Sequence, residues 1–262
     1  MKIPVAVIGA GNMGEAIIAS VCKSYKVNVC EADKTKADAI ANKYDVTVGD
    51  VNEVISKSEI VLIAVKPQVF EQVLSDIKDF ITDGHLVVSI AAGVTTKYIE
   101  ERLGGGVKVI RTMPNLPAQI SKGVTAIAGG ANTNDDDLHK ASVLLKFVGE
   151  TLIVDESIMD DVTAVSGSGP AYLFLFVEEY IKAAQALDLT DSEAKALVMQ
   201  TLRGSLELLE KSGEDASTLR ERVTSKGGTT AAALEEFSKG NISQIFTDAL
   251  AAAKRRAGEL AQ

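Results

Sequence analysis

A glycine motif close to the beginning constrains this chain most. The apolar residues 5–8 pass directly into Gly9-Ala10-Gly11-Asn12-Met13-Gly14, and a helical apolar pattern follows. This order predicts a buried strand, a tight turn and the start of a helix. Gly9 permits the turn, Gly11 lets a ligand approach the backbone, and Gly14 allows close packing of helix and strand. Because the helix N-terminus offers free N–H groups, the motif predicts a site for the pyrophosphate of a dinucleotide.

Length and composition narrow the class of protein. A chain of 262 residues, 46% hydrophobic and 24% charged, is typical of a globular enzyme with two domains. No segment approaches the roughly 18 apolar residues of a membrane helix. The net charge of -9 disfavours nucleic acid and anionic membrane as partners. The first residues do not resemble a signal peptide, and Cys22 and Cys30 lack metal or redox spacing. We therefore expect reduced cysteines, no metal and a cytoplasmic location.

Strands alternate with helices in the first part of the chain. The continuous apolar run 60–65 is typical of a parallel strand buried on both faces. The segments 124–128 and 152–154 are expected to form two edge strands. From residue 156 onward only helical periodicity remains. The prediction is an α/β fold, with a Rossmann-like doubly wound sheet in residues 1–155 and an all-helical C-terminal domain in residues 156–262.

An acidic residue follows the second predicted strand. Glu31 lies about twenty residues past the glycines, where a carboxylate commonly accepts hydrogen bonds from the adenine-ribose hydroxyls and selects NAD. Lys34 and Lys36 follow and could bind the extra phosphate of NADP. A carboxylate ~4 Å from that phosphate would cost about 4 kcal/mol per unit charge at an effective dielectric near 20, before the lysines offset it. The sequence favours NADH and leaves NADPH open.

The helical half contains one unusually apolar helix. Pro170 is expected at its first position, after Ser166-Gly167-Ser168-Gly169. The helix is apolar on more than one face, which indicates either a central buried helix or a subunit interface. A capping box at residues 190–193 begins the next helix, which ends before Gly213.

A loop of small and hydroxyl residues, Ser225-Lys226-Gly227-Gly228-Thr229-Thr230, joins two further predicted helices. Glycines, hydroxyls and the N–H groups of a helix N-terminus suit a carboxylate. Each hydrogen bond to a charged group contributes roughly 1.5–3 kcal/mol, so several together suffice for a small acid. A helix start with no ligand explains this segment equally well when it is taken alone.

Taken together, these segments resemble the pyrroline-5-carboxylate reductase family, whose members reduce a cyclic imine acid to L-proline with NADPH or NADH. The matching segments are residues 9–14, 64–67, 91–94, 111–115 and 166–172, and the most specific match is 223–230 with its Gly-Gly-Thr-Thr. One departure is Lys226, where the family commonly has proline. We expect this lysine to loosen the loop.

The resemblance implies a set of site residues. Thr230 would be catalytic, because its hydroxyl would reach the ring nitrogen and help to supply or accept the nitrogen's proton. The substrate carboxylate would bind Ser225, Gly227, Gly228, Thr229 and Thr230. The cofactor would bind the glycine turn, the loop after residue 63 and the small residues after the fifth strand. With the motif, this implies contacts from Ile8, Gly9, Ala10, Gly11, Asn12, Met13, Gly14, Glu31, Lys34, Asn52, Ala64, Val65, Lys66, Pro67, Ile90, Ala91, Ala92, Met113 and Asn115.

The resemblance also implies a homodimer, assembled into a higher oligomer such as a decamer. Little acid/base machinery is needed, because a protonated cyclic imine is already electrophilic. This agrees with a chain that has only two histidines.

Rival functions remain open. A 3-hydroxyacid dehydrogenase pairs similar domains but needs a catalytic lysine on the central helix, where this chain is apolar near Leu173. A prephenate-type dehydrogenase would need a catalytic histidine. His85, at a strand entrance, and His139, on a polar helix, are not placed for that role. The non-enzymatic alternative is a nucleotide sensor, which would bind ligand without turnover.

Overall fold

The computed structural model describes residues 2–260, which form two compact units. Within this range the first unit comprises residues 2–170 and 252–260, and the second is Ala171–Ala251. The compact units thus divide at Pro170, whereas the last strand of the sheet ends at Ile153. A domain boundary near residue 155 stays a prediction.

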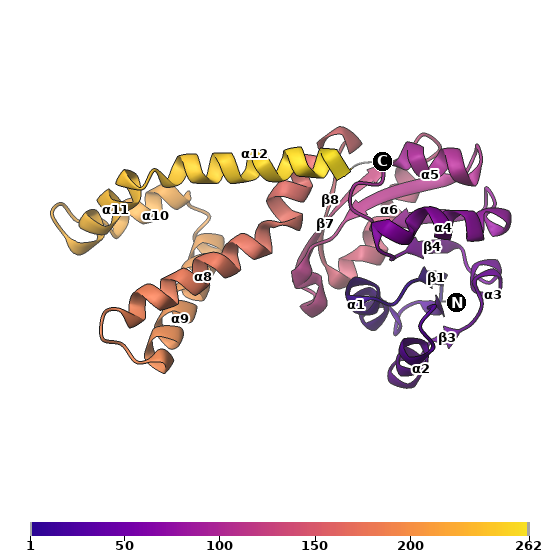
Figure 1. The fold of residues 1–262 in the computed structure, drawn as a ribbon, viewed down its shortest axis with the longest axis horizontal. Coiled ribbons are helices and arrows are strands. Elements are labelled where there is room, and N and C mark those ends of the chain that lie inside the picture. Colours follow the sequence, from indigo (N-terminus) through magenta and orange to yellow (C-terminus); the bar gives the residue numbers. More distant parts are fainter. Residues whose placement is uncertain (1, 261–262) are drawn as a thin grey trace. The chain divides into compact units, whose positions relative to one another are not determined.

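The first unit is built on an eight-stranded sheet (Figure 1). The spatial order is β3-β2-β1-β4-β5-β6-β7-β8, and all neighbouring pairs are parallel except β6 with β7. Because the order reverses at β1, a ligand crevice is expected between the carboxyl ends of β1 and β4. The strands are β1 (Pro4–Ile8), β2 (Lys26–Cys30), β3 (Thr47–Val48), β4 (Ile60–Ile63), β5 (Leu86–Ser89), β6 (Lys108–Met113), β7 (Gly123–Gly129) and β8 (Gly149–Ile153).

One strand differs from its expected place. The segment 124–128 was expected at an edge, but β7 lies between β6 and β8, and Ile127 and Ala128 are fully buried. The short connection 114–122, with its 3-10 helix Leu116–Ile120, lets β7 return antiparallel beside β6, since antiparallel neighbours need no long crossover. Strand β7 is interior because β8 pairs with its other side. The edges of the sheet are β3 and β8.

Helices cover both faces of this sheet, and alternating strand residues point to the two sides. Val5 and Val7 contribute to one core cluster, with α1 (Asn12–Val21), α2 (Lys34–Lys43) and α6 (Asp135–Leu145). Ala6 and Ile8 contribute to the other, with α3 (Val51–Ser56), α4 (Pro67–Ile77) and α5 (Thr96–Leu103). Each fully buried aliphatic side chain contributes about 1.5–3 kcal/mol. Burial on both faces holds the glycine turn at the end of β1 in one position.

No strand follows residue 156 within the described range, as predicted. A 3-10 turn leads into α7 (Met159–Val162), a π-helical turn Thr163–Gly167 and α8 (Gly169–Gln185), whose second residue is Pro170. The expected break at 166–170 is therefore a change of helix type rather than a loop. The remaining helices are α9 (Asp191–Ser212), α10 (Ala216–Arg222), α11 (Thr229–Lys239) and α12 (Ile242–Leu260).

Local signals in the helical part act as predicted. Thr190 and Glu193 form the capping box of α9: the Glu193 N–H donates to Thr190 Oγ1 at 3.3 Å, and the Thr190 N–H donates to Glu193 Oε2 at 2.9 Å. Gly213 ends α9 in the left-handed conformation, with φ of 65°. Local sequence signals thus mark both ends of α9.

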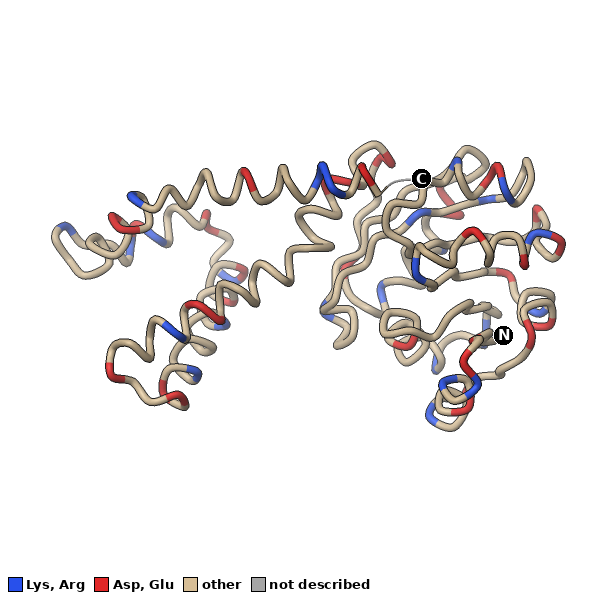
Figure 2. Tube along the Cα trace, viewed as in Figure 1, with Lys and Arg blue, Asp and Glu red and all other residues tan. Residues whose placement is uncertain are grey.

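The apolar helix α8 is exposed in the single chain. Phe174 and Leu175 are 56% and 59% exposed, and Figure 2 shows that no charged residue interrupts the first half of this helix. The second unit buries only a small cluster, formed by Ala184, Ala194 and Val198. Of the two alternatives for α8, a subunit interface therefore fits better than a central buried helix.

Candidate functional site

The glycine turn has the geometry that its sequence predicts. Gly9 has φ of +94°, and a Cβ there would lie 2.8 Å from the carbonyl oxygen of Ala64. A Cβ on Gly14 would collide with the carbonyl oxygen of Gly9. Gly11 differs, because nothing lies within 4 Å of an added Cβ. Gly9 and Gly14 are thus required for packing, whereas Gly11 leaves open space above the turn.

That open space belongs to a cavity of about 840 Å³ at the carboxyl ends of β1, β2 and β4. A second hollow of about 250 Å³ adjoins it, since Gly11 and Lys36 line both. Helix α1 begins at the shared wall, and its N-cap residue Gly11 has no side chain to occupy the helix N-terminus. The cradle therefore fits a dinucleotide, whose phosphates bind to N–H groups at such a helix start.

Several predicted cofactor residues line these walls and others do not. The large cavity includes seven of them: Ile8, Gly9, Gly11, Glu31, Ala64, Val65 and Lys66. Ala10 and Asn12 line the adjoining hollow. Met13 packs against the core, and Pro67 is the first residue of α4. Lys34 and Asn52 are exposed on α2 and α3, and it is Lys36 that reaches the cavity wall.

Sequence reasoning missed part of the wall. Gly49, Asp50 and Val51 follow β3, and Cys30 ends β2. Both strands were predicted, so the rule that ligands lie at the carboxyl ends of parallel strands could have found these four residues. Burial raises the pKa of the Cys30 thiol, and the nearby carboxylates of Asp50 and Glu31 raise it further.

Glu31 is tied to the glycine turn. Its Oε2 accepts a 2.7 Å hydrogen bond from the Ala10 N–H, and its Oε1 accepts a 3.0 Å bond from the Asp33 N–H. The carboxylate therefore joins the end of β2 to the phosphate-binding turn. Hydrogen bonds to a charged acceptor are stronger than neutral ones, so the side chain is held in place.

The other predicted cofactor residues lie at the ends of β5 and β6. Ile90, Ala91 and Ala92 follow β5, where the Ala91 N–H donates to Ser89 Oγ at 3.2 Å. Asn115 follows β6, and its Oδ1 accepts from the Val124 N–H at 3.0 Å. Met113 lies against Gly167, where an added Cβ would be 2.5 Å from the Met113 Cε. Met113 and Asn115 thus lie beside the π-helical turn, where Asn115 Nδ2 donates to Ser166 Oγ at 3.4 Å.

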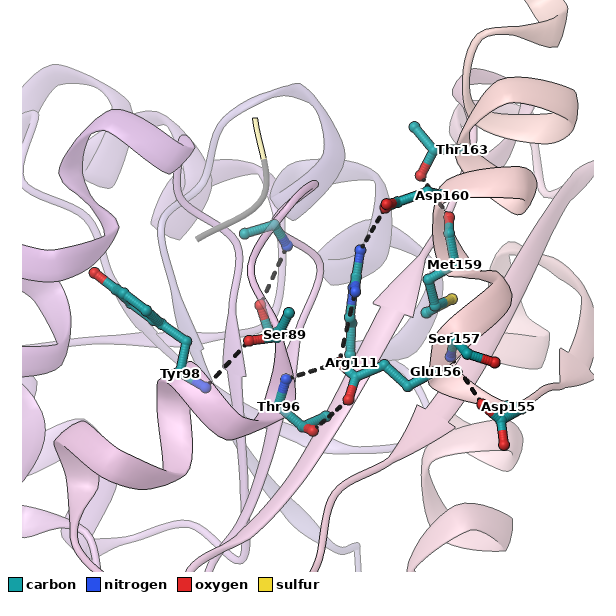
Figure 3. Close-up of polar contacts among 12 residues, drawn as sticks. Ser89, Thr96, Tyr98, Arg111, Asp155, Glu156, Ser157, Met159, Asp160 and Thr163 are labelled. Carbon is teal, nitrogen blue, oxygen red and sulfur yellow. Dashed lines mark hydrogen bonds and ion pairs between the residues drawn. The ribbon is translucent and has the colours of Figure 1, made fainter. Parts of the chain in front are cut away.

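A buried arginine organises the same region (Figure 3). Arg111 on β6 is 5% exposed, and its guanidinium lies 3.5 Å from Glu156 and 3.5 Å from Asp160. Glu156 also accepts hydrogen bonds from Thr96, at 2.8 Å from the N–H and 2.6 Å from Oγ1. Sequence reasoning did not identify this network, and a charged residue inside a strand was the available signal.

The hydroxyl loop lies in the second unit and has the form of an open helix start. Gly227 has φ of 71°, and the Gly228 N–H donates to the Ser225 carbonyl at 3.0 Å. Gly228 is the N-cap of α11 and supplies no side-chain cap. Thr229 and Thr230 are therefore the first helical residues, with Thr230 half-buried. Lys226, the departure from the family, is exposed.

Other chemistries find little support in the described part of the chain. It holds no group of three or more potential metal ligands. The ring of His85 accepts a 2.9 Å hydrogen bond from the Thr82 N–H in the turn before β5, opposite to the ligand edge. None of the helices between residues 2 and 260 is long and apolar enough to cross a membrane.

A doubly wound sheet with an open glycine cradle, followed by a helical unit, defines a nicotinamide-dinucleotide-dependent oxidoreductase. Residues 4–93 match a family model described as NADP oxidoreductase, coenzyme F420-dependent. Residues 156–260 match a model described as pyrroline-5-carboxylate reductase dimerisation. A pyrroline-5-carboxylate reductase of Mycobacterium leprae is 36% identical, over 98% of this chain and 96% of the relative. The chain belongs to the pyrroline-5-carboxylate reductase family.

Solved structures agree with this assignment. A pyrroline-5-carboxylate reductase from Coxiella burnetii has a TM-score of 0.93 and 33% identity, with 100% of both chains covered. A pyrroline carboxylate reductase from Plasmodium falciparum, solved with NADP bound, has a TM-score of 0.89 and 27% identity, over 99% of this chain and 98% of the other. The Rossmann-like fold with a helical C-terminal part is confirmed.

Proposed function

We propose that this protein reduces L-1-pyrroline-5-carboxylate to L-proline with NADH or NADPH. The observation that carries the proposal is the presence, in one chain, of both halves of the family's site. One is an open glycine turn above an 840 Å³ cavity, and the other is a Gly-Gly-Thr-Thr loop at an uncapped helix start. The family relatives match this chain from end to end.

The cofactor would lie on the first unit. The turn from Gly9 to Gly14 would hold the pyrophosphate, with the α1 N-terminus supplying N–H donors. The small residues Ala91 and Ala92 would leave room for the nicotinamide ring. Lys66 would line the crevice between these alanines and the glycine turn. The bound cofactor supplies the hydride that the imine carbon receives. The remaining cofactor residues predicted from the sequence are proposed contacts of the same site.

The substrate would bind at the loop before α11. The substrate carboxylate would accept hydrogen bonds from hydroxyl and backbone N–H groups of Ser225, Gly227, Gly228 and Thr229. These donors are neutral and need not change their charge state to bind it. Thr230 would orient the ring nitrogen and help to move its proton. Since the protonated imine is already electrophilic, the residues mainly have to hold the reacting carbons ~3–3.5 Å apart. This agrees with a site that contains no histidine.

The assembly extends the same proposal. The match of residues 156–260 to a dimerisation model supports a homodimer. We propose that dimers join into a larger oligomer such as a decamer. We also propose that the two domains divide near residue 155. The protein would work in the cytoplasm. Two free cysteines agree with a reducing compartment. Light scattering on the purified protein tests the assembly, because a mass equal to a single chain would contradict it.

The reaction is tested by following the absorbance of reduced cofactor in steady state. Purified protein is mixed with NADH or NADPH, each with and without pyrroline-5-carboxylate, and proline is measured as the product. Oxidation that requires the imine and yields an equal amount of proline supports the proposal. Binding of cofactor without turnover would instead leave the sensor function.

A further inference from the structure

We infer that Glu31 makes this enzyme select NADH over NADPH; the kinetic part of this inference rests on the proposed function, and the binding part does not. Glu31 lines the cofactor cavity at the end of β2. In doubly wound folds the adenine ribose lies at this strand end, so the 2′ substituent of the cofactor faces this residue.

The Glu31 carboxylate is held in place by backbone hydrogen bonds. Its two oxygens accept hydrogen bonds from Ala10 at 2.7 Å and from Asp33 at 3.0 Å. Turning the side chain outward would break both bonds and leave the Ala10 N–H without this acceptor inside the phosphate-binding turn. A surface glutamate without such bonds would swing aside at little cost, but this one is held in place.

A carboxylate fixed in this way favours a hydroxyl over a phosphate as its neighbour. Each carboxylate oxygen has a further lone pair, so Glu31 can accept a hydrogen bond from a ribose 2′-hydroxyl while it keeps both backbone bonds. A 2′-phosphate brings negative charge and acceptor oxygens to the same place. It would be repelled by the carboxylate and would receive no hydrogen bond from it.

The surroundings of Glu31 carry further negative charge. Asp50 lines the same cavity, and Asp33 caps α2 through the Thr35 and Lys36 N–H groups. Burial raises the pKa of the Cys30 thiol at this wall, and the carboxylates of Asp50 and Glu31 raise it further. On the positive side, Lys36 lines the cavity with an exposed side chain, and Lys34 is exposed beside it.

Other charged groups of the walls do not reverse this balance. Lys43, in the adjoining hollow, pairs with Glu15 at 2.8 Å and lies over the Tyr44 ring. Lys66 and Asp76 face the cavity from α4 and its N-cap. The exposed Lys36 ammonium lowers the repulsion but is screened by solvent, whereas the fixed carboxylate acts at short range.

The test begins with binding, without substrate. Fluorescence titration of the unaltered protein is expected to give NADH a Kd at least about tenfold lower than that of NADPH. Glu31→Gln keeps the shape and an acceptor oxygen but removes the charge. This variant should narrow the ratio of the NADPH Kd to the NADH Kd to about threefold or less, mainly because NADPH binds more tightly. Lys36→Ala should widen the ratio.

The matched control is Asp38→Asn, which removes the same charge from an exposed position on α2 outside both cavities. It should leave the ratio unchanged. Equal or tighter NADPH binding by the unaltered protein overturns the inference, as does an unchanged ratio in Glu31→Gln with an unchanged melting temperature. If Glu31→Gln does not fold, two other measurements decide whether the inference holds. They are the ratio of the two Kd values in the unaltered protein and the change of that ratio in Lys36→Ala.

Kinetics separate this inference from the proposed function. Imine-dependent oxidation with NADPH preferred would contradict the inference and leave the function standing. Preferential NADH binding with no imine-dependent turnover would contradict the function and leave the selectivity of the cavity standing.

Discussion

The guanidinium of Arg111 lies 3.5 Å from the carboxylate of Glu156, and this ion pair joins the interior strand β6 to the segment that follows β8. Arg111 pairs in register with Ser89 at the end of β5, so it lies below the segment where the nicotinamide ring is proposed. Glu156 in turn holds the first turn of α5 through Thr96. Through Asp160 and Glu156, the Arg111 side chain thus ties the start of α7 and the first turn of α5 to β6.

Arg111→Met should therefore destabilise the protein. The change leaves two carboxylates without their cation in a largely buried place, for which a cost of about 2–4 kcal/mol is expected. Since Glu156 and Asp160 are 26% and 30% exposed, solvent limits the cost to this range. Urea denaturation measures it. The control is Lys254→Met, which breaks an exposed pair with Asp161 and should cost less than about 1 kcal/mol. Equal costs for the two variants would contradict the role of Arg111.

The same substitution at two glycines of the turn should change different properties of the protein. Gly14→Ala places a methyl group against the Gly9 carbonyl and should lower stability by about 1–3 kcal/mol. Gly11→Ala adds the methyl to open space and should leave the melting temperature unchanged, while it weakens binding of NADH by about tenfold or more. Thermal melts and cofactor titration distinguish them. An unaltered affinity for NADH in Gly11→Ala would show that the pyrophosphate does not bind at this turn.

Thr230→Ala tests the proposed catalytic residue. Loss of a hydrogen bond to the charged ring nitrogen, at roughly 1.5–3 kcal/mol, should lower kcat/KM by about 10- to 100-fold. Cofactor affinity should change little. Thr230→Ser keeps the hydroxyl and should retain most of the activity. The control is Thr247→Ala, which removes an exposed hydroxyl that bonds Ser243 on α12. Unchanged turnover in Thr230→Ala would refute the role.

The Cys30 thiol reports occupancy of the cofactor cavity. Burial and the neighbouring carboxylates raise its pKa, so little thiolate exists at neutral pH and alkylation by iodoacetamide should be slow there. The rate should increase as the pH rises through the alkaline range. Cys22 is buried and should react more slowly, which peptide mapping by mass spectrometry can show.

Bound cofactor should protect Cys30 because this residue lines the cavity. At about ten times its Kd, NADH leaves about one tenth of the sites open, so alkylation should slow by about tenfold. Labelling that NADH does not slow would show that the cofactor binds away from this wall.

Much of the fold could be read from local patterns. The run 60–65 became β4, the Gly9 motif became a strand, turn and helix, and Thr190 with Glu193 became a capping box. These features follow from neighbours a few residues apart, because side-chain periodicity and φ/ψ preferences act over that range. The order of motifs along the chain was likewise enough to indicate the family.

Tertiary structure alone decided the contacts between distant segments. Nothing near residues 124–128 indicated that this strand would be interior, because that depends on which strand it pairs with. The bond from Ala10 to Glu31 and the burial of Arg111 between Glu156 and Asp160 likewise join residues far apart in the sequence. Sequence periodicity determined which elements form and which faces are apolar. The packing of the sheet determined how Glu31 is held and what it faces, since a hydrogen bond depends on positions in space.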